Sequence, residues 1–166
     1  MTCMVSLPDG TYMILNGAQE GYAGFGLAQD PNFVALLYDP TQPIGQRMSI
    51  LNQTIVARMY HSEAVLLQDG HVLVSGSDPQ EAAYPEEFRI EVSSFLCIHS
   101  RLIKPHQRYV PPYLTNSALQ QPQFTLPVSD WTYGQTYQIT NVKLFQNSGI
   151  RVSLIGGLFI VFCFLI

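Results

Sequence analysis

The feature that most restricts the fold of this 166-residue chain is a short motif that occurs twice, 60 positions apart. The first copy, LPDGTYMILNG, covers residues 7–17, and the second, LQDGHVLVSG, covers residues 67–76. Each contains Asp-Gly, which favours a tight hairpin turn because glycine adopts positive φ without steric cost. Apolar runs at residues 4–7 and 64–67 precede the turns, and further apolar runs follow them. Each copy therefore predicts two antiparallel strands joined by a tight turn.

Repeats of about 40 residues or more that are built from short strands are typical of β-propeller blades. Between the two copies, residues 33–39 (FVALLYD) predict another strand, and the frequent Gly, Pro and Asn residues argue against a helix. Two blades cannot close a ring. We therefore expect an all-β chain in which residues 1–91 form a partial β-propeller of about two blades.

The charge of the chain changes sign along its length. Residues 1–91 carry eleven acidic and three basic side chains, a net −8, whereas residues 92–166 carry one acidic and five basic side chains, a net +4. This change predicts a boundary near residue 92. Residues 92–109 are basic, show no regular alternation, and are interpreted as an irregular insert.

Residues 110–166 predict a second β unit. The paired prolines in residues 110–114 favour an extended segment. Short strands are expected at residues 124–126, 135–139 and 150–155. This pattern predicts a truncated, immunoglobulin-like β-sandwich that ends in an apolar C-terminal tail.

Composition excludes some classes of protein. Charged residues make up only 12% of the chain, about half of the usual 25% or so, which indicates that other protein normally covers part of its surface. The net charge of −4 argues against nucleic-acid binding. The three cysteines are far apart and form no zinc or disulfide pattern.

The two ends of the chain bear on its location. The N-terminal residues have no basic region and no long apolar run, so no signal peptide is predicted. The segment Val152–Ile166 contains no charge, but its 15 residues fall short of the roughly 20 that a membrane-spanning helix needs. Membrane contact through this tail stays open as an alternative.

Seven stretches of the sequence match, in order, those of one known family. The longest is RMYHSEAVLLQDGHVLVSGSDP at residues 58–79. The others are NGAQ at 16–19, AGFG at 23–26, YPEEFRIE at 84–91, PPYL at 111–114, YGQT at 133–136 and RVSLI at 151–155. In these stretches the chain resembles the glyoxal oxidase and galactose oxidase family of copper-radical oxidases. The resemblance implies a seven-bladed, kelch-type propeller followed by an E-set sandwich, of which this chain would contain the last blades and the beginning of the sandwich.

The resemblance also implies a chemistry. Family members are extracellular and oxidise a small aldehyde or primary alcohol with O₂, which is reduced to H₂O₂. One copper is held by two Tyr and two His side chains, and one Tyr is joined to a Cys and can hold a radical. Tyr60 matches the axial, non-crosslinked Tyr ligand, a catalytic residue, and His61 matches the adjacent His ligand.

The chemistry of copper explains these residue types, because copper(II) prefers the nitrogen and oxygen ligands that imidazole and phenolate provide. Neighbouring side chains on a strand point to opposite faces of the sheet. We therefore expect Tyr60 and His61 to reach one metal only from the end of a strand or from a bulge.

The sequence departs from the family pattern in three respects. The crosslinked Cys and Tyr of the family lie upstream, and Cys3 does not match that Cys. No His follows residues 151–155, and residues 92–109 interrupt a short link of the family. A retained intron at 92–109 and another at the C-terminus would make the last two departures gene-model artefacts. We therefore expect a copper-radical oxidase fragment without the Tyr–Cys cofactor that is itself inactive. The alternatives are a non-catalytic β module that binds carbohydrate or protein, and a small tail-anchored membrane protein.

Overall fold

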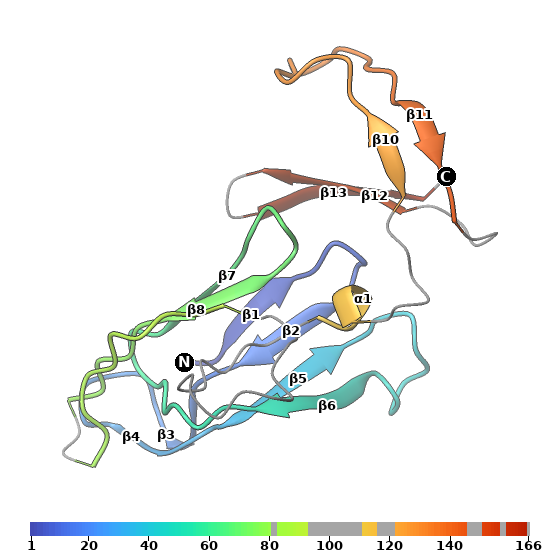
Figure 1. The fold of residues 1–166 in the computed structure, drawn as a ribbon. Coiled ribbons are helices and arrows are strands. Elements are labelled where there is room, and N and C mark those ends of the chain that lie inside the picture. The colour runs from blue at the N-terminus through green and yellow to red at the C-terminus, as the bar shows by residue number, and fades with distance from the viewer. Residues whose placement is uncertain (81–82, 93–110, 116–121, 146–150, 157–158, 166) are drawn as a thin grey trace, which may run out of the picture.

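The computed structural model describes residues 1–80, 83–92, 111–115, 122–145, 151–156 and 159–165 (Figure 1). Within these ranges the chain forms thirteen strands and one four-residue helix, so the predicted all-β class is confirmed. Most of the predicted insert, residues 93–109, lies outside the described residues.

The first sheet is a four-stranded antiparallel meander in the order β1-β2-β5-β6. Its strands are β1 (Cys3–Ser6), β2 (Tyr12–Leu15), β5 (Val34–Tyr38) and β6 (Met48–Gln53). The strand expected at residues 33–39 is therefore confirmed as β5. Between β2 and β5 the chain makes a separate hairpin of β3 (Ala18–Gly21) and β4 (Ala28–Pro31).

The second sheet has three antiparallel strands in the order β7-β8-β9. They are β7 (Glu63–Leu66), β8 (Val72–Ser75) and β9 (Glu91–Val92). Hairpins β1–β2 and β7–β8 contain the two copies of the sequence motif, so both predicted hairpins are confirmed.

The two hairpin turns have nearly the same geometry. In the first turn, the Leu7 amide donates to the Thr11 carbonyl at 2.8 Å, and in the second the Leu67 amide donates to the His71 carbonyl at 2.7 Å. The φ angles of the two turn glycines are 83° at Gly10 and 84° at Gly70. Because L side chains avoid such angles, the Asp-Gly pair explains the turn in both copies.

One hydrophobic core joins the two sheets. The chain contacts itself between β1 and β7, and Figure 1 shows the β7–β8 hairpin lying over β1. Five core side chains come from the first sheet and its turn: Val5, Leu7, Met13, Leu15 and Ala35. Three come from the second sheet: Leu66, Val72 and Val74.

The C-terminal part contains two further strand pairs. The first pairs β10 (Gln123–Thr125) with β11 (Thr140–Lys143), and the second pairs β12 (Arg151–Gly156) with β13 (Phe159–Leu165). Two of the strands expected in this part, at residues 124–126 and 150–155, correspond to β10 and β12. No helix within the described residues is long and apolar enough to cross a membrane.

Two local predictions for the C-terminal part are wrong. Residues 112–115 form one helical turn, α1 (Pro112–Thr115), rather than an extended segment, because proline at the first helical position lacks only an N–H that the helix would leave unpaired. Residues 135–139 are not a strand. The Tyr137 ring stacks on Trp131 and its hydroxyl accepts the Thr132 amide at 2.7 Å, so side-chain contacts fold this segment back on itself.

Candidate metal centre

Tyr60 and His61 occupy a tight turn directly before β7. The Ser62 amide donates to the Met59 carbonyl at 3.3 Å and closes the turn. His61 has a φ of +58°, a left-handed conformation that L side chains rarely adopt. Such a conformation costs about 1–2 kcal/mol for a residue other than glycine. The surrounding structure must therefore stabilise this turn.

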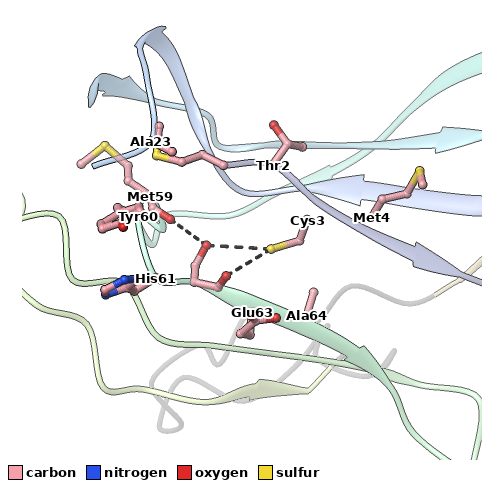
Figure 2. Close-up of a pocket in the computed structure, with 11 residues that line it drawn as sticks. Thr2, Cys3, Met4, Ala23, Met59, Tyr60, His61, Glu63 and Ala64 are labelled. Atoms are coloured by element: carbon pink, nitrogen blue, oxygen red, sulfur yellow. Dashed lines mark hydrogen bonds between the residues drawn. The ribbon is translucent and has the colours of Figure 1, made fainter. Parts of the chain in front are cut away.

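The left-handed turn brings two rings together. The Tyr60 and His61 ring centroids are 4.0 Å apart and their planes meet at 24°, so the phenol and the imidazole stack (Figure 2). Phe25, from the loop between β3 and β4, presents its ring at right angles to both, with centroid distances of 5.0 Å to Tyr60 and 5.1 Å to His61. The expectation that the Tyr and His side chains would lie at a strand end agrees with this arrangement. Phe25 lies in the matching stretch AGFG at residues 23–26, but the sequence analysis assigned it no role.

The residues that directly follow β8 form hydrogen bonds with the turn. The Met59 amide donates to Ser77 Oγ at 2.9 Å, and the Asp78 amide donates to the Tyr60 carbonyl at 2.7 Å. A Cβ atom at Gly76 would lie 2.6 Å from the His61 carbonyl oxygen, closer than a real Cβ approaches. The glycine that ends the second sequence motif is therefore needed where the backbone passes His61.

A buried ion pair holds the chain just before the turn. Arg58 and Glu91 are 1% and 3% exposed, and Arg58 Nε lies 2.7 Å from Glu91 Oε2. The same guanidinium donates to the carbonyls of Gly76 and Arg89, both at 2.7 Å. This pair links the turn to β8 and β9. Sequence reasoning missed it because a buried charge pair produces no local periodicity.

Cys3 approaches the turn from β1. Its thiol donates to the Ser62 carbonyl at 3.3 Å. Burial raises the pKa of Cys3, so the thiol stays protonated and is a poor nucleophile near neutral pH.

The turn borders a cavity of about 350 Å³. Its walls come from two segments and one further residue: Met1–Met4, Met59–Ala64 and Ala23. Within the described part of the chain, no group of three or more His, Cys, Asp or Glu side chains is arranged to hold a metal. The cavity therefore offers one phenol and one adjacent imidazole as donors, with Glu63 also on its wall.

Comparison with known proteins gives the following relatives. The family described as "Glyoxal oxidase N-terminus" matches residues 1–95. A WSC domain-containing protein of Arthroderma benhamiae is 50% identical over 156 residues, which cover 94% of this chain and 15% of that protein. Aldehyde oxidase GLOX of Vitis pseudoreticulata is 51% identical over 96 residues, covering 55% of this chain and 18% of that protein. Aldehyde oxidase GLOX1 of Arabidopsis thaliana is 37% identical over 147 residues, which cover 84% of this chain and 21% of that protein.

The fold and the turn define an all-β protein of repeated hairpins with an oxygen and a nitrogen donor side by side at one strand end. The family match covers more than half of the chain, and the chain belongs to the glyoxal oxidase family. This confirms the resemblance found in the sequence. The chain spans about a fifth or less of the length of the relatives named above.

Proposed function

We propose that this chain carries part of the copper site of an oxidase that acts on small aldehydes or primary alcohols. Tyr60 and His61 are two of its metal ligands. The observation that supports this most directly is the left-handed turn, in which two stacked rings border one cavity. Backbone strain of this kind is concentrated at functional sites, where the surrounding structure stabilises it.

The residues present fit copper as a partial site. A phenolate oxygen and an imidazole nitrogen are donors that copper(II) favours. His61 is exposed and Tyr60 is half-buried, so both rings can be reached from solvent. Two protein donors are fewer than a tetragonal copper site needs, and we propose that the remaining ligands and the Tyr–Cys radical group of the family are not contributed by this chain.

The proposed reaction of the complete oxidase balances as aldehyde plus water plus O₂ giving carboxylic acid plus H₂O₂. Copper together with the family's Tyr–Cys radical supplies the acceptors for the two electrons that leave the substrate. In this chain, Tyr60 supplies a phenolate oxygen and His61 supplies an imidazole nitrogen. Phe25 packs at right angles to both rings and helps to hold them in place.

We also propose that the two sheets are consecutive blades of a β-propeller. The first sheet is a four-stranded meander, and its edge strand β1 contacts β7, the first strand of the next sheet. On the face of the first sheet away from the core, a row of apolar side chains crosses all four strands: Met4, Ile14, Leu36 and Ile50. Met4 is 66% and Ile50 is 74% exposed, which is expected of a blade face that packs against another blade.

The test of the proposed site is copper binding by the purified chain. Titration with copper(II), followed by electron paramagnetic resonance and by the phenolate-to-copper absorption band, should give one bound copper. Tyr60→Phe should remove the absorption band, and His61→Gln should weaken binding and change the nitrogen hyperfine pattern. His71→Gln is the matched control, since His71 lies in the same hairpin at the opposite turn.

The same samples test turnover. With methylglyoxal, the chain alone should release no more H₂O₂ than a copper-only blank. Copper-dependent H₂O₂ release would contradict the proposal that essential groups are absent from this chain. Equal copper binding by the native chain and by Tyr60→Phe/His61→Gln would contradict the assignment of these two ligands.

A further inference from the structure

Asn16, at the end of β2, connects the first sheet to the turn that carries Tyr60 and His61. Its side chain is 2% exposed, and its amide Nδ2 donates to Ser62 Oγ at 3.2 Å. Ser62 Oγ in turn donates to the Met59 carbonyl at 2.8 Å. Figure 2 shows the hydrogen bonds that join Ser62 to Cys3 and to Met59. A buried side chain that follows β2 of the first sheet thus reaches Ser62, the last residue of the turn before β7.

The Ser62 hydroxyl adds a second hydrogen bond across the turn, beside the backbone bond. The backbone bond between the Ser62 amide and the Met59 carbonyl is long, at 3.3 Å, whereas the hydroxyl of Ser62 reaches the same carbonyl at 2.8 Å. If the hydroxyl bond is lost, the turn loses its shorter closure. His61 can then relax toward the extended conformation, in which neighbouring side chains point to opposite faces. The two rings would separate.

Asn16 is itself held in place. The side chain of Asn32 donates to the Asn16 carbonyl at 3.1 Å. The next amide, that of Gly17, donates to the carbonyl of Arg58, which directly precedes the turn, at 2.8 Å. The residues after β2 therefore form hydrogen bonds on both sides of the turn: with Arg58, which precedes it, and with Ser62, its last residue.

We propose that Asn16 is a positioning residue of the metal centre: acting through Ser62, it holds the Tyr60 and His61 rings on one side of the turn. The inference rests on the proposed function only in naming these two rings as ligands. The role of Asn16 in holding the rings is a property of the chain without metal, and it can be measured separately.

The first experiment measures ring positions by NMR without copper. The His61 imidazole C–H signals should be shifted upfield by the stacked Tyr60 ring, with His61→Gln used to assign them. Asn16→Gly removes the amide and still accepts the left-handed φ of 63° at this position, and Ser62→Ala removes the hydroxyl. Both variants should lose most of the upfield shift, and Ser62→Thr, which keeps a hydroxyl, should regain it.

The control is Thr11→Val, which removes a hydroxyl that donates to Asp9 in the turn at the other end of the same hairpin. Its His61 signals should match those of the native chain. Methyl signals of Val74 and Met13 report whether each variant keeps its core. Unchanged His61 shifts in a folded Asn16→Gly or Ser62→Ala variant would overturn the inference.

The second experiment repeats the copper(II) titration. If Tyr60 and His61 are ligands, Asn16→Gly and Ser62→Ala should bind copper about tenfold more weakly than the native chain, as is common when support around a ligand is lost. Thr11→Val should bind as the native chain does. If the native chain binds no copper, the proposed function fails, and the NMR shifts alone decide the role of Asn16.

Discussion

Hairpins β1–β2 and β7–β8 have the same turn and the same pairing register, yet they bury opposite faces. The first pairs Val5 with Met13, and both side chains are buried. The equivalent pair 60 positions later, Val65 and Leu73, is only half-buried. In the second hairpin the buried side chains are those one position along each strand, including Leu66 and Val72.

The difference teaches how the repeats are related. If both hairpins buried the same face, a two-fold axis would relate them. Because they bury opposite faces, the second hairpin stacks on the first in the same sense, and Met4 and Ile50 on the far face of the first sheet are exposed. A repeat of this kind can continue through further copies, as propeller blades do. Four predictions test this comparison, in order of decreasing effect.

The buried ion pair joins the chain before the second hairpin to β9, and breaking it should have the largest effect on stability. Arg58→Met leaves the Glu91 carboxylate buried without its partner and frees the Gly76 and Arg89 carbonyls. We expect a loss of about 3–5 kcal/mol in the free energy of unfolding, measured with urea. Arg58→Met/Glu91→Leu should recover much of that loss; a double variant as unstable as the single one would show that the charge pair is not the cause.

The opposite faces predict unequal effects at equivalent positions. Met13 is fully buried, so Met13→Ala should lower the free energy of unfolding by about 2–5 kcal/mol. Its equivalent in the second hairpin, Leu73, is half-buried, and Leu73→Ala should cost distinctly less. Equal losses at the two positions would contradict the stacking described above.

The turn before β7 should be strained at His61. His61→Gly and His61→Ala both remove the ring, but only glycine adopts the φ of +58° without steric cost. The glycine variant should therefore be more stable than the alanine variant by about 1 kcal/mol, from parallel urea unfolding curves. The same exchange at His71, which has no positive φ, should favour alanine or make no difference.

The smallest effect concerns acid. The backbone amide of His71 donates to the Asp69 carboxylate at 3.0 Å, and this bond lowers the pKa of Asp69 below its usual value. A lowered pKa in the folded state means that the stabilisation is present above the unfolded pKa of about 4 and is lost as the pH falls through the folded pKa. Asp69→Asn should lose less stability than the native chain as the pH falls below about 4, as measured by thermal unfolding. If the two proteins lose stability equally on acidification, the hydrogen bond to Asp69 does not contribute to the acid sensitivity of the fold.

Much of the fold could be predicted from local signals. The Asp-Gly pairs and the flanking apolar runs predicted both hairpins, because turn chemistry and strand pattern lie within a few residues of each other. Residues 110–114 and 135–139 were misjudged for the opposite reason. Pro112 is compatible with a helical turn as well as with extended chain, and the Trp131–Tyr137 contact that bends the second segment is a tertiary one.

The candidate site was predicted in part. Tyr60 and His61 could be named because they lie side by side in a stretch that resembles a known family. Phe25, Asn16, Arg58 and Glu91 also lie in matching stretches, but no motif gives them a role at the turn. Phe25, Asn16 and Glu91 are far from the turn in sequence, so only the folded chain brings them to it.

The sequence by itself determined that this chain is all-β, where its two hairpins turn, and to which family it belongs. Those properties follow from turn residues and from residues that match in order. Only the tertiary structure decided which face of each hairpin is buried. Strands with apolar residues on both faces, such as β2 and β8, carry no local signal that distinguishes the two. The choice is made by the stacking of one sheet on the other, and the same stacking brings Asn16 against the turn of Tyr60 and His61.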